Sequence, residues 1–342
     1  MKRLKILMLF GGESSEHDVS IKSAKNVYAA IDKHKHEVSL AYIDRDGLWW
    51  LLPSWADSLG HHPGEQLAVT PGSRSLRLLS SNEDIAVDVI FPVLHGKNGE
   101  DGTVQGLAEI AHIPIVGCDV ESSAVCMDKD ATKRLLESAG MPIVPWVTVG
   151  RDDDARSVLR RVKELHSDGP WFVKPSRAGS SVGVTKVTSA DGLWKAITFA
   201  HEHDELALVE VAVSGRELEV GVLGNIPDHK ASGVGEIIAG REFYDYEDKY
   251  SDQSASRIIL KAQLPTALTK VIRQYATDAY RVLGCRGLAR IDFLLSDELI
   301  PYINEVNTLP GFTDISMYPK LWNQKGMSYE ALVDRLIMLA LE

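Results

Sequence analysis

The chain is poor in cysteine and carries more acidic than basic residues. Its three cysteines, Cys118, Cys126 and Cys285, are odd in number and lack metal-ligand spacing, which argues against a disulfide framework and indicates reduced thiols. The 37 Lys and Arg against 48 Asp and Glu leave a net charge of −11, so we expect neither a nucleic acid nor an anionic membrane as a partner. An anionic ligand would need a local cluster of lysines, arginines and backbone amides.

Long apolar runs, internal repeats and low-complexity segments are also absent. No stretch approaches the length of a transmembrane helix. The basic start, Met1–Lys5, resembles the beginning of a signal peptide, but the apolar run behind it ends at Phe10, before Gly11-Gly12-Glu13, and is too short for one. With 44% hydrophobic and 25% charged residues over 342 positions, we expect a soluble cytoplasmic protein of two or three domains.

The first part of the chain has the pattern of an α/β domain. Leu4–Phe10 is a continuous apolar run that predicts a buried parallel strand, apolar residues then recur at helical spacing over 21–31, and Glu37–Ile43 predicts a second strand. Val87–Leu94 predicts another strand, followed by a helix from about Thr103, and together these elements define a domain over residues 1–123. Residues 51–83 show no clean period and receive no assignment.

Two further units follow, at 124–213 and 214–342. The first contains a helix that ends at Ala139-Gly140, where glycine is the usual terminator. It also contains strands at Trp171–Pro175 and Ala207–Val213. In the last unit we expect strands at 218–223, 234–238, 258–260, 288–295 and 302–306, with helices over about 265–283 and 327–341.

Two strands near the end of the chain carry acidic and basic residues on one face. Residues two apart in a strand face the same side, so Arg290 lies beside Asp292, and Glu305 beside Asn307. The polar turn 296–298 makes the strands a hairpin that brings Asp292 roughly opposite Glu305. Such oxygen ligands suit Mg²⁺ holding nucleotide phosphates. A charged surface sheet is the alternative, but the agreement of two strands favours the metal site.

A glycine-rich loop, Ser176–Gly183, follows the strand that ends at Lys174-Pro175. Glycines let backbone amides approach a phosphate, and the hydroxyls add donors. The loop is no Walker A motif, because no Gly-Lys-Ser/Thr follows, and on its own it could equally be a hairpin turn. Lys174 strengthens the phosphate interpretation. Lys129, at the start of a helix, could supply a second charge, although a solvated lysine is the ordinary alternative.

A third group of candidates follows the N-terminal strands. Gly11–His17 is a glycine turn that lacks the G-x-G-x-x-G spacing of a dinucleotide site. Glu16 within it stands at a strand-to-helix junction, where open α/β sheets bind ligands. His95–Gly102 occupies a comparable junction. For both segments a capping turn and a ligand site remain equally open.

In this order, these groups resemble the D-alanine–D-alanine ligase family of the ATP-grasp fold. The resemblance covers nearly the whole chain, chiefly excepting 51–83, and 304–313 is its most specific block. The matching stretches are Gly11–His17, Phe91–Gly106, Met127–Lys129, Phe172–Pro175, Gly179–Gly183, Phe243–Tyr250, Ala289–Asp292 and Asn304–Thr313.

The resemblance implies an α/β, three-domain ATP-grasp fold whose N-terminal domain is an open parallel α/β unit. It also implies ATP-dependent joining of two D-alanine molecules through a D-alanyl phosphate, for peptidoglycan precursor synthesis, with two Mg²⁺ or Mn²⁺ ions, in a cytoplasmic homodimer. Sister enzymes that accept D-lactate or D-serine are the nearest alternatives. The intact Lys249-Tyr250 pair argues against D-lactate, whereas D-serine stays open. An ATP-grasp carboxylase, a carrier-linked ligase and an inactive nucleotide-binding protein are more distant alternatives.

The resemblance also assigns roles to residues. For ATP it implies Lys129 and Lys174 at the phosphates, Glu210 and the backbone near Val213 at adenine, Glu217 at the ribose, and contacts from Ser180, Ser181 and Asn304. For metal ions it implies Asp292, Glu305 and Asn307. For the first D-alanine it implies Glu16 at the ammonium group, with His95 nearby, and Ser180 and Tyr250 hydrogen-bonded with Glu16. For the second D-alanine it implies Ser316 at the carboxylate, and for the oxyanion it implies Arg290 and the Gly311 amide. Lys249 would come from a lid over residues 239–255.

Overall fold

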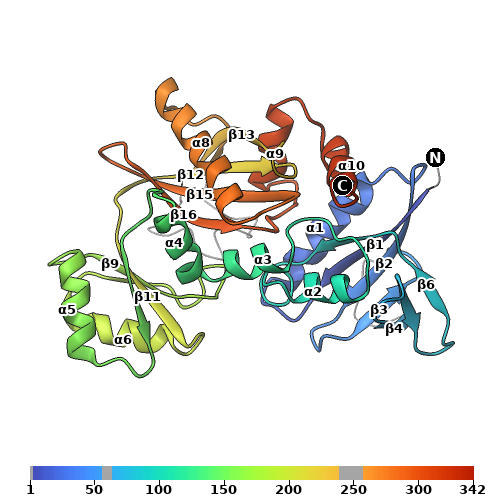
Figure 1. Ribbon diagram of the computed structural model, residues 1–342, viewed down its shortest axis with the longest axis horizontal. Helices are drawn as coiled ribbons and strands as arrows, with labels where there is room; N and C mark the ends of the chain where they lie inside the picture. The colour runs from blue at the N-terminus through green and yellow to red at the C-terminus, as the bar shows by residue number, and fades with distance from the viewer. Residues whose placement is uncertain (1–2, 56–63, 239–256) are drawn as a thin grey trace.

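The computed structural model describes residues 3–55, 64–238 and 257–342. Three β-sheets, each covered by helices, make up a mixed α/β structure (Figure 1), which confirms the predicted fold class. Lys249, Tyr250 and the predicted lid over residues 239–255 lie outside the described residues.

The first sheet has seven strands in the order β6-β5-β4-β3-β2-β1-β7. Its elements are β1 (Leu4–Gly11), α1 (His17–Ala30), β2 (His36–Ile43), β3 (Trp49–Leu52), β4 (Glu65–Val69), β5 (Ser75–Leu78), β6 (Asp84–Ala86), β7 (Val89–Val93) and α2 (Thr103–Ile110). The expected strands and helices are present, and parallel pairing joins β1 to β2 and β7. The strands from β3 to β6 are antiparallel, so the predicted open parallel sheet is extended by strands from the region left unassigned.

The second sheet is antiparallel, with the order β10-β9-β11-β8. The elements of this part are α3 (Val120–Met127), α4 (Lys129–Ser138), β8 (Trp146–Gly150), α5 (Ala155–Leu165), β9 (Trp171–Pro175), β10 (Thr185–Val187), α6 (Ala190–Ala200) and β11 (Leu206–Val211). Helix α4 begins after Asp128, whose carboxylate accepts from the amides of Asp130 and Ala131, and it is followed by Gly140 at φ 72°, as the sequence predicts. Strand β11 ends before Val213, two residues earlier than expected.

The third sheet is antiparallel, with the order β14-β13-β12-β15-β16. Its elements are β12 (Gly215–Leu223), β13 (Lys230–Ile238), β14 (Arg257–Ile259), α8 (Thr266–Val282), β15 (Leu288–Ser296), β16 (Pro301–Asn307), α9 (Met317–Gln324) and α10 (Tyr329–Leu339). The predicted hairpin is confirmed, because Asp292 lies opposite Glu305. A β-bulge between Asp292 and Phe293 leaves Asn304 without a register partner across the hairpin.

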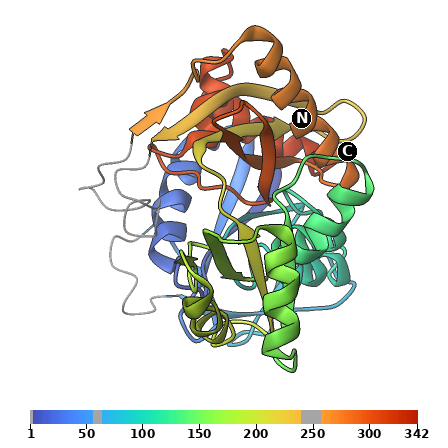
Figure 2. The ribbon, with the colours of Figure 1, turned by 90° about the vertical axis from the view of Figure 1, so that its left-hand side faces the viewer.

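The C-terminal helices join the third sheet to the first. Tyr318, Trp322, Leu332 and Leu336 share one buried apolar core with Phe10 of β1. In addition, the carboxylate of Asp334 on α10 lies 3.2 Å from the ring of His36 and 3.1 Å from the ammonium group of Lys35. The four-stranded unit lies below the five-stranded sheet in both views (Figures 1 and 2).

The two predicted domain limits differ in whether they fall inside a helix or in a connection between strands. The limit at 123 lies inside α3, whereas the limit at 213 lies in the connection between β11 and β12. Helix α3 packs against β16 of the third sheet as well as against α2 and α4. The segment from α3 to α4 therefore connects all three sheets.

Candidate active site

A cleft of about 1100 Å³, counting its open mouth, lies where the three sheets meet. Predicted residues from every part of the chain line it, namely Glu16, His95, Lys129, Ser180, Arg290, Glu305, Asn307, Gly311 and Ser316.

On the third sheet, the cleft is lined by a guanidinium group set between carboxylates. Arg290 donates two hydrogen bonds to Asp292, at 2.7 and 2.6 Å, and its Nε lies 3.4 Å from an oxygen of Glu219. Strand pairing explains this arrangement, because Asp292 stands opposite Glu305 on one side and Glu219 on the other. Glu219 was not among the predicted residues, although its two-residue spacing from Glu217 places both on one strand face.

These carboxylates fix the charge of Arg290. Burial acts to lower the pKa of Arg290, but Asp292 and Glu219 outweigh it and raise that pKa well above the usual value. The side chain therefore remains a cation throughout the working pH range. A planar cation with fixed orientation is suited to stabilising an oxyanion that forms in the cleft.

The two predicted phosphate-binding lysines come from different elements, and each lies close to a carboxylate. Lys129, on α4, donates to the carbonyl of Ala178 at 2.7 Å, and its Nζ lies 4.0 Å from a carboxylate oxygen of Glu305. Lys174, on β9, pairs with Glu210 of β11 at 2.8 Å. Burial lowers the pKa of Lys129. A phosphate group entering the cleft would therefore meet cations that already have carboxylate neighbours.

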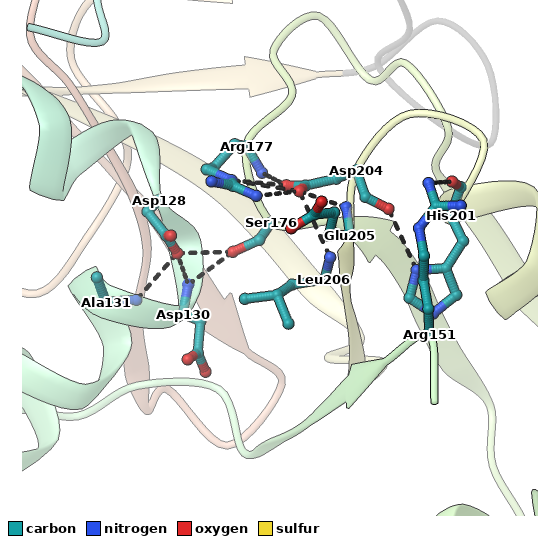
Figure 3. Close-up of polar contacts among 10 residues, drawn as sticks. All are labelled: Asp128, Asp130, Ala131, Arg151, Ser176, Arg177, His201, Asp204, Glu205 and Leu206. Atoms are coloured by element: carbon teal, nitrogen blue, oxygen red, sulfur yellow. Dashed lines mark hydrogen bonds and ion pairs between the residues drawn. The ribbon is translucent and has the colours of Figure 1, made fainter. Parts of the chain in front are cut away.

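The base of the glycine-rich loop is attached to both of its neighbours (Figure 3). The hydroxyl of Ser176 donates to Asp128 at 2.7 Å and accepts from the amide of Asp130 at 3.2 Å. The next residue, Arg177, donates to the buried Asp204 from its amide at 2.7 Å and from its guanidinium at 2.6 Å. These bonds tie the loop to the start of α4 and to the segment before β11, so its base has a fixed position.

The tip of the loop has a strained backbone and reaches toward the first sheet. Ser180 and Ser181 have φ values of 52° and 59°, a conformation that costs energy for residues other than glycine and is found most often at functional sites. A Cβ atom on Gly179 would lie 3.6 Å from Oε2 of Glu16, and one on Gly96 would lie 3.1 Å from it. Glycine at both positions leaves room beside the Glu16 carboxylate.

Around Glu16, the structure assembles a buried cluster of titratable groups. The ring of His95 contacts the carbonyl of Leu309 at 3.1 Å, the hydroxyl of Ser23 at 3.3 Å and a carboxylate oxygen of Glu100 at 3.9 Å. Burial acts to lower the pKa of His95, yet Glu100 and Glu16 raise it above the usual value. Burial and the charge of Glu16 raise the pKa of Glu100. The sequence analysis gave no role to Glu100, which follows His95 in the same turn.

Opposite this cluster, the turn before α9 presents amide and hydroxyl groups. Ser316 precedes the first residue of the helix, and its hydroxyl accepts from the amide of Thr313 at 3.0 Å. A Cβ atom on Gly311 would lie 2.9 Å from that hydroxyl, so only glycine fits there without a shift. A helix N-terminus with an adjacent hydroxyl favours a carboxylate ligand.

The remaining predicted residues do not line the cleft directly. Within the described ranges they are Lys174, Ser181, Glu210, Val213, Glu217, Asp292 and Asn304. Lys174 and Glu210 pair with each other, and Asp292 pairs with Arg290, which lines the cleft. Among the residues that the structure places, no group of three or more His, Cys, Asp or Glu is arranged to hold a metal; the predicted metal set has two carboxylates and one amide oxygen.

Comparison with known proteins gives a consistent result. The family model "D-ala D-ala ligase N-terminus" matches residues 5–118, and "D-ala D-ala ligase C-terminus" matches residues 135–338. The chain is 44% identical to D-alanine–D-alanine ligase A of Escherichia coli K12, over 100% of this chain and 97% of that protein. It is 45% identical to D-alanine–D-alanine ligase A of Chromobacterium violaceum, over 100% and 96%.

Solved structures agree with these relatives. The D-alanine–D-alanine ligase from Coxiella burnetii has a TM-score of 0.87 at 36% identity, covering 99% of this chain and 95% of that one. The VanG D-Ala:D-Ser ligase from Enterococcus faecalis has a TM-score of 0.90 at 36% identity, covering 99% and 100%.

Proposed function

The chain belongs to the D-alanine–D-alanine ligase family, and from this premise we propose that its cleft joins two D-alanine molecules into D-alanyl-D-alanine with ATP as co-substrate. The product serves peptidoglycan precursor synthesis. The observation that carries this function is the full-length identity of 44% to such ligases. The cleft supports it, because Glu16, Lys129 and Arg290 come from three parts of the chain and line one space.

A carboxylate is a poor acylating agent, so the first D-alanine must be phosphorylated before a bond to the second can form. Lys129 and Lys174 would offset the charge of the phosphate groups during this transfer. Their present partners, Glu305 and Glu210, hold the ammonium groups near the cleft before ATP arrives. Ser180 and the amides of the strained loop would add donors to the phosphates.

Metal binding by the third sheet is a further part of the proposal. Asp292, Glu305 and Asn307 provide hard oxygen donors, and the register of β15 and β16 places Asp292 directly opposite Glu305. This donor set fits Mg²⁺ or Mn²⁺, which would add positive charge beside the phosphate groups. Arg290 holds Asp292 through both of its carboxylate oxygens, so a metal ion would share that carboxylate with the guanidinium group.

The two D-alanines would bind at opposite sides of Arg290. Glu16 would hold the ammonium group of the first, with His95 beside it, and Ser316 at the start of α9 would hold the carboxylate of the second. The free amine of the second D-alanine would attack the carbonyl carbon of the acyl phosphate, and its C–N bond would form as the carbonyl oxygen becomes an oxyanion. This tetrahedral intermediate would then collapse to the amide, with inorganic phosphate as the leaving group and loss of a proton from the amine nitrogen. Arg290 and the Gly311 amide would stabilise that charge.

The nucleotide base would lie against the second sheet. We propose Glu210 and the backbone near Val213 for adenine and Glu217 for the ribose, with Ser181 and Asn304 as further nucleotide contacts. Lys249 and Tyr250 would close the cleft from the lid, which would protect the acyl phosphate from water.

The proposed setting is a homodimer in the cytoplasm. Across the described part of the chain, no helix has the length and apolar character needed to cross a membrane. The expected partners are D-alanine, ATP and a second copy of the chain.

Ligation of D-alanine to D-serine is the second candidate. It is supported only as another member of the same family, because the VanG D-Ala:D-Ser ligase, with a TM-score of 0.90 over 99% of this chain, has the same 36% identity as the D-alanine–D-alanine ligase from Coxiella burnetii. Incubation with ATP, Mg²⁺ and an equal mixture of D-alanine, D-serine and D-lactate, followed by mass spectrometry, separates the candidates. We expect D-alanyl-D-alanine as the main product and no ADP release with L-alanine alone. D-alanyl-D-serine as the main product would replace the first function with the second.

A further inference from the structure

Glu210 is held from both sides by buried lysines, one of which has no role in the site described above. Its Oε2 lies 2.8 Å from Nζ of Lys174, and its Oε1 lies 3.0 Å from Nζ of Lys133. Lys133 is 1% exposed, Glu210 4% and Lys174 8%. A fully buried lysine is rare unless it is paired, so the position of Lys133 calls for a physical reason.

The backbone fixes Lys133 in this place. It follows Lys129 by four residues on α4, so the two lysines project from one helix face. Its ammonium group also donates to the carbonyl of Val144 at 3.0 Å and lies 5.5 Å above the ring of Trp146. Lys133 thus joins α4 and the segment leading into β8 to the carboxylate on β11.

Lys174 has a different attachment. It lies opposite Leu208 on β11, and Glu210 lies opposite Phe172 on β9. Lys174 and Glu210 are therefore diagonal neighbours on one face of an antiparallel pair. In this geometry the ammonium group of Lys174 is held at 2.8 Å by the Glu210 carboxylate, so a shift of that carboxylate would shift Lys174.

The charges of this triad are unequal. One carboxylate faces two ammonium groups, so the group carries an excess positive charge beside the proposed nucleotide site. Burial acts to raise the pKa of Glu210, but Lys133 and Lys174 outweigh it and lower that pKa below its usual value. Burial lowers the pKa of Lys133. If Lys133 were neutral, Lys174 would be the single close counter-ion of a buried carboxylate.

We propose that Lys133 is a positioning residue for nucleotide binding. It holds one oxygen of Glu210 and offsets part of the charge of that carboxylate, so that Lys174 keeps its position for the phosphate groups. This inference rests on the proposed function, since it assumes that an adenine nucleotide binds beside Glu210. It adds a residue to the site that itself touches neither substrate.

The first test replaces Lys133 with methionine, which keeps the length of the side chain without its charge. We expect Lys133→Met to raise the KM for ATP and the Kd for ADP at least tenfold while the KM for D-alanine stays within twofold. A merely structural role would lower the amount of active enzyme and leave both KM values unchanged. Arg134→Met is the matched control, because Arg134 is the next residue of α4 and its side chain is 64% exposed. It should leave all three constants within twofold.

The second test asks whether Lys133 acts through Glu210. In a Glu210→Gln background, adding Lys133→Met should change the Kd for ADP less than twofold, because no carboxylate remains to be balanced. Glu210→Gln leaves both lysines without this carboxylate, and the double variant leaves only Lys174 without it. The comparison of these two variants therefore also decides the matter if Lys133→Met alone fails to fold. A tenfold loss in that background, or a KM for ATP within twofold of the unmutated value in folded Lys133→Met, would overturn the proposal.

These measurements separate the inference from the proposed function. An unmutated chain that binds ADP but forms no dipeptide would refute the ligase function, while the Kd for ADP would still decide the role of Lys133. If the unmutated chain forms dipeptide and folded Lys133→Met binds ADP with an unaltered Kd, the inference alone is refuted.

Discussion

Replacement of Arg290 by lysine tests the geometry of the cleft more directly than removal of the charge. Lysine keeps the positive charge but presents a point donor in place of a planar fork. In the structure that fork makes two hydrogen bonds to Asp292, at 2.7 and 2.6 Å, and its Nε also faces Glu219 at 3.4 Å. A lysine ammonium group can keep one of the two bonds to Asp292.

The expected size of the effect follows from the lost bond. A hydrogen bond between charged groups contributes about 1.5–3 kcal/mol, and about 1.4 kcal/mol corresponds to tenfold. If the lost donor also acts on the oxyanion, removal of one such donor typically lowers kcat about 100- to 1000-fold. We therefore expect Arg290→Lys to lower kcat at least 100-fold, and the free energy of unfolding by about 1–3 kcal/mol.

A matched control lies on the same sheet. Arg216 on β12 makes the same bidentate contact with Glu236, at 2.7 and 2.6 Å, and neither residue lines the cleft. Its side chain is 34% exposed, so we expect Arg216→Lys to cost about 1 kcal/mol of stability and to leave kcat within twofold. Urea denaturation gives the stability of both variants, and coupled ADP release gives kcat.

The comparison between the two variants decides the role of Arg290. A loss of kcat in Arg290→Lys alone, with a comparable loss of stability in both variants, would show that the Arg290 guanidinium acts on the reaction and does more than hold the sheet together. If Arg290→Lys retained a kcat within tenfold of the unmutated enzyme, with unchanged dependence on D-alanine, the assignment of Arg290 to the oxyanion would be refuted.

Three further predictions concern the carboxylates and the lid. Asp292→Asn and Glu305→Gln should keep near-native circular dichroism and lose nearly all ADP release; full activity in both would remove them from the metal site. Tyr250→Phe should gain the ability to form D-alanyl-D-lactate at mildly acidic pH, where the competing amine of D-alanine is more fully protonated. Mass spectrometry of the products would show no D-alanyl-D-lactate if Tyr250 lies away from the acceptor. For Asp204, burial acts to raise the pKa, but Arg177 outweighs it and lowers that pKa below its usual value near 3.8. The stability that Asp204 contributes is therefore present above pH about 4 and lost as pH falls through its folded pKa. The free energy of unfolding of the unmutated protein should consequently exceed that of Asp204→Asn by less in acid than at neutral pH. A difference that grew in acid would contradict this.

The elements that the sequence predicts well are those in which a single local pattern suffices. The β15–β16 hairpin is one of these, because two-residue alternation fixed the faces and the polar turn fixed the pairing of Asp292 with Glu305. Helix α4 is another, since both its start at Asp128 and the glycine that follows it at Gly140 have local signatures. The bulge in the hairpin was not predicted, although it interrupts the alternation. Two successive polar residues, Asn304 and Glu305, stand between the buried Ile303 and Val306.

The region over residues 51–83 illustrates the opposite case. Its strands β4 and β5 have five and four residues, too few for a period to stand out from composition. They are held by pairing with their neighbours in the first sheet, so their existence depends on contacts that single-chain periodicity does not contain. The same is true of the Arg177–Asp204 contact (Figure 3), whose partners come from separate segments of the second unit.

The arrangement of charge in the cleft explains how an acidic chain can bind a polyanion. Its cations have carboxylate neighbours before any ligand binds, because Lys174 pairs with Glu210, and Arg290 pairs with Asp292. ATP would therefore have to share these cations with the carboxylates, and each carboxylate would need a second partner when its cation turns toward phosphate. For Asp292 that partner would be the proposed metal ion, and for Glu210 it is Lys133 at 3.0 Å. On this proposal, nucleotide binding depends on the side chains that compensate the carboxylates as well as on the cations proposed to contact the phosphates.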